Sequence, residues 1–175
     1  KDIIGDEPFI FTWSDDFIVA EPNRFSQLIA LYESHRSPVL SCIRAQKDDD
    51  YERYGFASGT EVSPGVVQIE ALIEKPGKAA APSDLATVSG GLFTPDIFTY
   101  LEQASAQLGE GKELYYNDAL KLMVADGKTV LAAEITDGVF YDAGDKLEYL
   151  KTVIDFGLAN PQLSDPLKEF LRSRL

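Results

Sequence analysis

Most of the chain alternates between short apolar runs and segments whose apolar residues recur every three or four positions. A run that is apolar at nearly every position is typical of a strand buried on both faces of a sheet. The first such run covers residues 8–13 and ends at the acidic pair Asp15 and Asp16. Strands are predicted over residues 8–13, 39–45, 53–57, 66–73, 85–93, 129–135 and 139–141.

The segments with helical spacing predict helices between these strands. One begins at Arg24, and its apolar face carries Phe25, Leu28, Ile29 and Tyr32. Thr94 is expected to cap a second helix that has Pro95 at its first position and extends to residue 106. Further helices are predicted around residues 119–123, 146–158 and 167–171.

Turn-forming residues divide the strands. Gly59 and the pair Pro64-Gly65 predict turns between antiparallel strands, and Asp137 followed by Gly138 predicts a hairpin. Strands mixed with helices along 175 residues predict the α/β class, with a mixed, partly parallel sheet flanked by helices. This length suits one compact domain, residues 1–175, and is too short for two ordinary ones.

Composition narrows the classes of partner. The net charge of −13, from 29 acidic and 16 basic residues, repels a polyanion, so general nucleic-acid binding is not expected. No apolar stretch reaches membrane-spanning length, and the first eight residues lack the order of a signal peptide, so no membrane association is expected. The single cysteine, Cys42, lies in an apolar run, which favours a buried thiol and a cytoplasmic protein.

Polar residues at the ends of predicted strands are the candidates for chemistry, because ligands of open α/β sheets bind beyond the carboxyl ends of strands. Such residues are Asp15 and Asp16, Glu74 and Lys75, and the segment that begins at Asp142. Two aspartates from separate strand ends can hold Mg²⁺ through single oxygens and leave positions for water and phosphate. Lys75 could then meet a phosphate as a point charge. Glu74 would point the opposite way along a regular strand, so it can share the face of Lys75 only if the strand ends before Pro76 and the backbone turns.

Plainer interpretations remain open at this point. Asp15 and Asp16 could form a solvated junction, Glu74 and Lys75 a surface pair, and Asp142 a turn. The single histidine, His35, and the single cysteine exclude a zinc cage built from these residue types. Neither a P-loop nor a G-x-G-x-x-G segment occurs in the chain.

Eight short segments occur in a recognisable order along nearly the whole chain. They are Ile4-Gly5-Asp6-Glu7-Pro8-Phe9, Ser14-Asp15-Asp16, Tyr54-Gly55, Ile73-Glu74-Lys75-Pro76, Ala81-Pro82-Ser83-Asp84-Leu85-Ala86, Thr94-Pro95-Asp96-Ile97-Phe98, Asn117-Asp118-Ala119 and Tyr141-Asp142-Ala143-Gly144-Asp145-Lys146. In this order they resemble the family of bacterial UTP-glucose-1-phosphate uridylyltransferases, and the I-E-K-P and Y-D-x-G-x-K segments are fairly specific to sugar nucleotidyltransferases.

The resemblance implies a Rossmann-like fold and a function. The reaction would form UDP-glucose and pyrophosphate from UTP and glucose 1-phosphate, with Mg²⁺ as cofactor. Asp15 and Asp142 match the metal-binding aspartates, and Lys75 matches the catalytic lysine that contacts the sugar phosphate. Glu74 matches the residue that binds the glucose hydroxyls, and Gly55 matches a glycine that lets the backbone meet the sugar.

The family is longer than this chain, and its nucleotide-binding part, with a glycine-rich loop, precedes the matched region. The chain is therefore expected to be the C-terminal, sugar-phosphate and metal-binding portion, inactive alone. A truncated sheet exposes edges and apolar faces, so a homo-oligomer is expected. Thr12-Trp13-Ser14, Ser89-Gly90-Gly91 and Asn117 depart from the family's usual residues, so a nucleotidyltransferase for another hexose 1-phosphate and a binding module without turnover stay open as alternatives.

Overall fold

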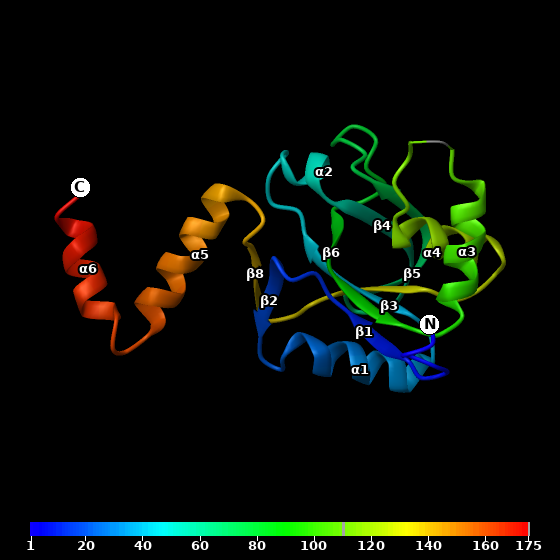
Figure 1. The fold of residues 1–175 in the computed structure, drawn as a ribbon, viewed down its shortest axis with the longest axis horizontal. Coiled ribbons are helices and arrows are strands. Elements are labelled where there is room, and N and C mark those ends of the chain that lie inside the picture. The colour runs from blue at the N-terminus through cyan, green and yellow to red at the C-terminus, as the bar shows by residue number, and fades with distance from the viewer. Residues whose placement is uncertain (110, 175) are drawn as a thin grey trace.

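The computed structural model describes residues 1–109 and 111–174, and it shows a curved mixed sheet with helices on both faces (Figure 1). The strands are β1 (Phe9–Phe11), β2 (Asp16–Ala20), β3 (Val39–Arg44), β4 (Gly55–Ser63), β5 (Val66–Glu74), β6 (Leu85–Phe93), β7 (Leu131–Glu134) and β8 (Gly138–Asp142). The helices are α1 (Arg24–His35), α2 (Asp50–Arg53), α3 (Ile97–Gln107), α4 (Tyr116–Ala125), α5 (Lys146–Ala159) and α6 (Ser164–Arg172).

The main sheet has the strand order β1-β6-β3-β7-β5-β4. Strands β3 and β7 pair in parallel and the other neighbours pair antiparallel, so the prediction of a mixed, partly parallel sheet is confirmed. Strand β4 also pairs with β6, through Gly55 opposite Thr87 and Phe56 opposite Ala86. This extra pairing turns the sheet back on itself. It also brings the start of β4 beside the start of β6.

Apolar side chains fill both faces of the sheet. Helices α3 and α4 pack on one face over a cluster that includes Leu40, Phe93 and Leu120. Helix α1 packs on the other face, where Leu28 and Val88 belong to a second cluster. All nine residues of β6 are buried, because β6 has β3 on one side and β1 and β4 on the other. The prediction of a strand over residues 85–93 is therefore confirmed at both ends.

The first strand and the predicted hairpin differ from expectation. Strand β1 is short and half-buried, because it pairs only with β6 among the described strands, and Trp13 is 48% exposed. The prediction of a hairpin at Asp137 and Gly138 is wrong. Strand β7 pairs with β3 and β5, whereas β8 leaves the main sheet and pairs antiparallel with β2 in a sheet of two strands. The φ angle of +50° at Asp137 accompanies this change of direction.

Three local predictions also need correction. Residue 53 does not begin a strand: Arg53 ends the short helix α2, and β4 begins at Gly55. Gly59 is not in a turn but at a register shift inside β4, where a Cβ would lie 1.8 Å from the carbonyl oxygen of Gln68. Thr94 does not cap a helix that starts at Pro95, because α3 begins at Ile97, after a turn closed by the Ile97 N–H and the Thr94 carbonyl.

Helices α5 and α6 extend away from the body as an arm that follows β8 (Figure 1). Several large apolar side chains of this arm are exposed, namely Leu147, Tyr149, Leu150, Val153, Phe156, Leu163 and Phe170. Among the described helices, none has the length and apolar content needed to cross a bilayer.

Candidate functional site

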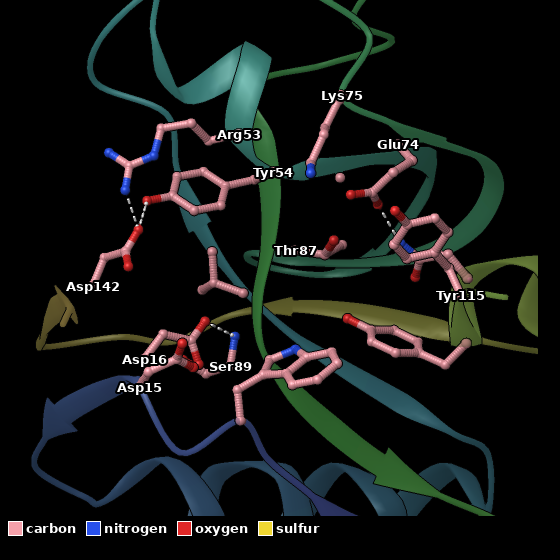
Figure 2. Close-up of a pocket in the computed structure, with 15 residues that line it drawn as sticks. Asp15, Asp16, Arg53, Tyr54, Glu74, Lys75, Thr87, Ser89, Tyr115 and Asp142 are labelled. Carbon is pink, nitrogen blue, oxygen red and sulfur yellow. Dashed lines mark hydrogen bonds and ion pairs between the residues drawn. The ribbon is translucent and has the colours of Figure 1, made fainter. Parts of the chain in front are cut away.

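One pocket, with a volume of about 370 Å³, contains every site residue that the family resemblance implies. These residues are Asp15, Gly55, Glu74, Lys75 and Asp142, and Figure 2 labels all of them except Gly55. Asp15 lies between β1 and β2, Gly55 begins β4, Glu74 ends β5, and Asp142 ends β8. The other lining residues are Trp13, Asp16, Arg53, Tyr54, Thr87, Val88, Ser89, Tyr115, Tyr116 and Asn117.

Glu74 and Lys75 are consecutive, yet both side chains line the pocket (Figure 2). Side chains alternate between the two faces of a regular strand. Here β5 ends at Glu74, and Lys75 has a φ angle of +46°, which turns the backbone. The Lys75 N–H donates to the Tyr54 carbonyl at 3.1 Å and holds this turn against β4. The strand end that Pro76 predicts therefore places a carboxylate and an ammonium side by side.

A polar cage covers the Cα atom of Gly55. A Cβ at this position would lie 2.8 Å from Thr87 Oγ1, 2.9 Å from Glu74 Oε2 and 3.1 Å from Asn117 Nδ2. The Asn117 amide donates from Nδ2 to Glu74 Oε2 at 2.8 Å. A side chain at residue 55 would displace these groups, so glycine is required for the cage to form.

The carboxylates of Asp15 and Asp142 approach each other across Gly144. A Cβ on Gly144 would lie 3.0 Å from Asp15 Oδ2 and 3.3 Å from Asp142 Oδ1. Asp15 is exposed and makes no hydrogen bond through its carboxylate among the described residues. The two oxygens thus face one shared space beside Gly144. No group of three or more His, Cys, Asp or Glu side chains in the described chain is arranged to hold a metal.

Asp142 is fixed in the pocket wall by three donors. Its Oδ2 accepts from the Arg53 guanidinium and, at 2.8 Å, from the Tyr54 hydroxyl (Figure 2). Its Oδ1 accepts from the Gly144 N–H at 3.2 Å. Burial, together with this carboxylate, raises the pKa of Tyr54 above its usual value. Tyr54 therefore stays a neutral donor, and Arg53 offsets the charge of Asp142.

A second anchored carboxylate, Asp16, lies deeper in the pocket. Its Oδ2 accepts from the Ser89 N–H at 2.9 Å. Burial raises the pKa of Asp16, and the Ser89 N–H and the nearby charge of Arg24 offset part of this rise. Arg24, which is 4% exposed, donates to the Ser89 carbonyl at 2.6 Å and to Thr12 Oγ1 at 2.8 Å. This network joins α1 to the bulge of β6, where Ser89 has a φ angle of +58°.

Aromatic side chains also line the pocket. Trp13 packs edge-on against Phe11, with ring centroids 5.1 Å apart, and lies 6.4 Å from the ring of Tyr116. Burial raises the pKa of Tyr116, which keeps its hydroxyl neutral. Because Trp13 is the single tryptophan of the chain and lines the pocket, its fluorescence can report binding there.

Several lining residues were missed by the sequence analysis for identifiable reasons. Arg53 was assigned to a strand, and the short helix α2 that carries it has no apolar periodicity. Thr87 and Ser89 sit inside the apolar run of β6, which predicts only core packing. Tyr54 and Asn117 lie in two of the segments that resemble the family, and their place in those segments was the one signal that could have identified them.

Comparisons with known proteins agree with one another. The chain matches the nucleotidyl transferase family over residues 1–155. A UTP–glucose-1-phosphate uridylyltransferase of Staphylococcus epidermidis is 33% identical over 172 residues, which are 98% of this chain and 58% of that protein. The protein of the same name from Bacillus subtilis is 33% identical over 175 residues, covering 100% of this chain and 58% of its own length. The chain thus spans less than two thirds of these relatives.

Solved structures show the same likeness. A UDP-glucose pyrophosphorylase from Acinetobacter baumannii superposes with a TM-score of 0.83 and 25% identity, covering 99% of this chain and 59% of that one. A UDP-glucose pyrophosphorylase complexed with UDP-glucose superposes with a TM-score of 0.80 and 27% identity, covering 91% of this chain and 59% of that one.

Proposed function

The chain belongs to the nucleotidyl transferase family, and on that premise we propose that the whole protein forms UDP-glucose and pyrophosphate from UTP and glucose 1-phosphate. The described pocket would supply the sugar-phosphate and metal half of the active site. The nucleotide-binding half would come from chain that is not among these 175 residues. Two facts support this division: the chain spans 58% of its relatives, and its sequence carries no glycine-rich phosphate loop.

The proposed reaction is an in-line displacement. An oxygen of the sugar phosphate attacks the α-phosphorus of UTP, a new P–O bond forms, and the bond to the β-phosphate breaks with release of pyrophosphate. Such a transfer needs positioning and charge neutralisation more than a nucleophilic side chain. The pocket provides both, and no residue with the role of a covalent nucleophile is required.

The site residues predicted from the sequence each have a role in this proposal. The Lys75 ammonium binds the phosphate of glucose 1-phosphate and holds the attacking oxygen in place, and it has no ion-pair partner among the described residues. The Glu74 carboxylate accepts hydrogen bonds from sugar hydroxyls. Gly55 keeps the cage free of a side chain, so the ring can approach the backbone.

The donor set at Asp15 and Asp142 fits Mg²⁺. Both residues offer hard carboxylate oxygens, and these oxygens face the same space beside Gly144. Only Oδ1 of Asp142 points to that space, because Oδ2 is held by Arg53 and Tyr54. We propose that these two oxygens hold the cation and leave its other positions to water and phosphate. When bound, Mg²⁺ would neutralise charge on the reacting phosphates.

The observation that carries the proposal is the entry of Glu74 and Lys75 into one pocket with both aspartates. The test measures pyrophosphate release from UTP and glucose 1-phosphate with Mg²⁺, for the 175-residue chain and for a longer form with the missing portion restored. We expect turnover only from the longer form. Release of pyrophosphate by the chain alone would show that nucleotide binding had been assigned to the wrong part of the protein.

We also propose that the chain self-associates, as the sequence analysis predicts. The apolar side chains that α5 and α6 expose support this, because such surface is costly in a monomer. Sedimentation velocity over a range of concentrations is the test. A single monomeric species at the highest concentration would contradict the proposal.

A further inference from the structure

Four buried side-chain atoms lack a hydrogen-bond partner in the described residues, and all four belong to residues that line the pocket. They are Asp16 Oδ1, Thr87 Oγ1, Ser89 Oγ and Asn117 Oδ1. A buried polar atom without a partner costs free energy, so such atoms are few in native proteins. Their restriction to one pocket indicates that a ligand with several polar groups supplies the missing partners.

Two of these atoms, from Thr87 and Asn117, belong to residues of the cage above Gly55. Asn117 is 3% exposed and lies at the start of α4. Its amide has a defined orientation, because the Glu74 carboxylate can only accept a hydrogen bond and must therefore face Nδ2. The carbonyl oxygen Oδ1 is then left without a partner, beside the carboxylate that is proposed to bind sugar.

We propose that Asn117 is a specificity-determining residue of this subsite and acts through both ends of its amide. Nδ2 positions Glu74, and Oδ1 accepts a hydrogen bond from a second hydroxyl, next to the one that Glu74 binds. The ligand class is a hexose 1-phosphate with two neighbouring free hydroxyls. This inference rests on the proposed function, because it assumes that the pocket takes the sugar phosphate.

Two neighbouring acceptors, the Glu74 carboxylate and the Asn117 carbonyl, require a ligand that donates two hydrogen bonds. An ionised carboxylate and an amide carbonyl both accept hydrogen bonds, and neither can donate. Thr87 Oγ1, on the third side of the cage, can act as donor or acceptor and adapts to either hydroxyl. A ligand that presents hydrogen or fluorine in place of either hydroxyl therefore leaves a buried acceptor unpaired.

The test combines a change in the Asn117 side chain with changes in the ligand, as in a double-mutant cycle. Dissociation constants are measured for the 175-residue chain with glucose 1-phosphate and with each of its monodeoxy and monofluorodeoxy analogues, by the fluorescence of Trp13 and by calorimetry. For the unaltered chain we expect two neighbouring positions at which loss of the hydroxyl weakens binding by about tenfold. In Asn117→Ala, one of these two penalties should disappear, because its acceptor is gone.

Asn117→Thr serves as the second variant in case the alanine variant does not fold, and Asn160→Ala is the matched control. Asn160 is exposed after α5, outside the pocket, so its variant should reproduce the unaltered pattern. If Asn117→Ala weakens every ligand by the same factor, Asn117 only supports the fold and the inference is wrong. If the unaltered chain binds no hexose 1-phosphate, the proposed function of the pocket is wrong and the inference falls with it.

Discussion

Gly55 and Glu74 stand opposite each other in the ladder between β4 and β5, and a Cβ on Gly55 would lie 2.9 Å from Glu74 Oε2. The absence of a side chain at one residue therefore sets the position of the carboxylate at the other. Thr87 reaches the same point because β4 also pairs with β6. The cage thus depends on three consecutive strands and on Asn117 from α4.

Gly55→Ala tests this relationship. The added methyl group would meet Thr87 Oγ1 at 2.8 Å, so the cage must open. We expect affinity for glucose 1-phosphate to fall by at least about tenfold and unfolding free energy to fall by ~1–3 kcal/mol. Fluorescence titration of Trp13 and urea unfolding measure the two effects. In the control Gly109→Ala, the nearest atom would be 3.7 Å away, so neither quantity should change. If the two variants behave alike, the cage is not part of the binding site.

Lys75→Ala should weaken binding only of ligands that carry phosphate. The loss of one charged hydrogen-bond donor is expected to cost roughly 1.5–3 kcal/mol, or about tenfold to a hundredfold in affinity. Calorimetric titration with glucose 1-phosphate and with methyl glucoside separates the phosphate contribution from that of the ring. Lys78→Ala is the matched control, because the exposed Lys78 pairs with Asp48 outside the pocket. A similar loss for both sugars would mean that Lys75 supports the pocket rather than binds phosphate.

Asp15→Asn should reduce binding of a divalent cation. Mn²⁺ can replace Mg²⁺ as a probe, and its binding to the chain is followed by electron paramagnetic resonance. The reference state is the chain from which a chelator has removed the metal. We expect the affinity to fall by about tenfold or more, because one of two anionic ligands becomes neutral. Asp165→Asn on α6 controls for charge alone, since Asp165 is exposed and far along the chain. Unchanged Mn²⁺ binding in Asp15→Asn would refute the cation site.

Arg24→Met should destabilise the chain by about 2–4 kcal/mol, since the buried guanidinium donates to Ser89 and Thr12 and offsets the charge of Asp16. The control is Arg44→Met. Arg44 pairs with Asp84 and Glu134 but is 43% exposed, so its loss should cost about 1 kcal/mol or less. Urea unfolding at neutral pH gives both values. The prediction fails if the two variants lose the same free energy.

The sequence predicts the elements of this fold better than their pairing. The pattern of apolar residues predicted both ends of β6 and placed α1 and α5 within a few residues, because burial on one or both faces of an element determines which of its positions are apolar. The partner of β8 has no such effect on the pattern. Asp137 and Gly138 have the chemistry of a hairpin turn, and only the packing of β7 between β3 and β5 sends the chain away to β2.

The sequence predicts those pocket residues whose position depends on their immediate neighbours in the chain. Pro76 indicated where β5 ends, and that end brings Glu74 and Lys75 together. The contacts of Arg53 and Tyr54 with Asp142 join residues about ninety positions apart, and no spacing rule anticipates them. The orientation of the Asn117 amide likewise depends on a carboxylate from another strand.

Strand β1 has a neighbour on one side only, β6, in the part of the chain that the structure describes. Its far side presents backbone N–H and C=O groups that a further strand could pair with. The segment that follows β1 leads through Trp13 to Asp15, so a strand docking there would arrive beside the mouth of the pocket. Growth of the sheet and completion of the proposed active site would then be one event, which would link the assembly of the whole protein to the turnover proposed for it.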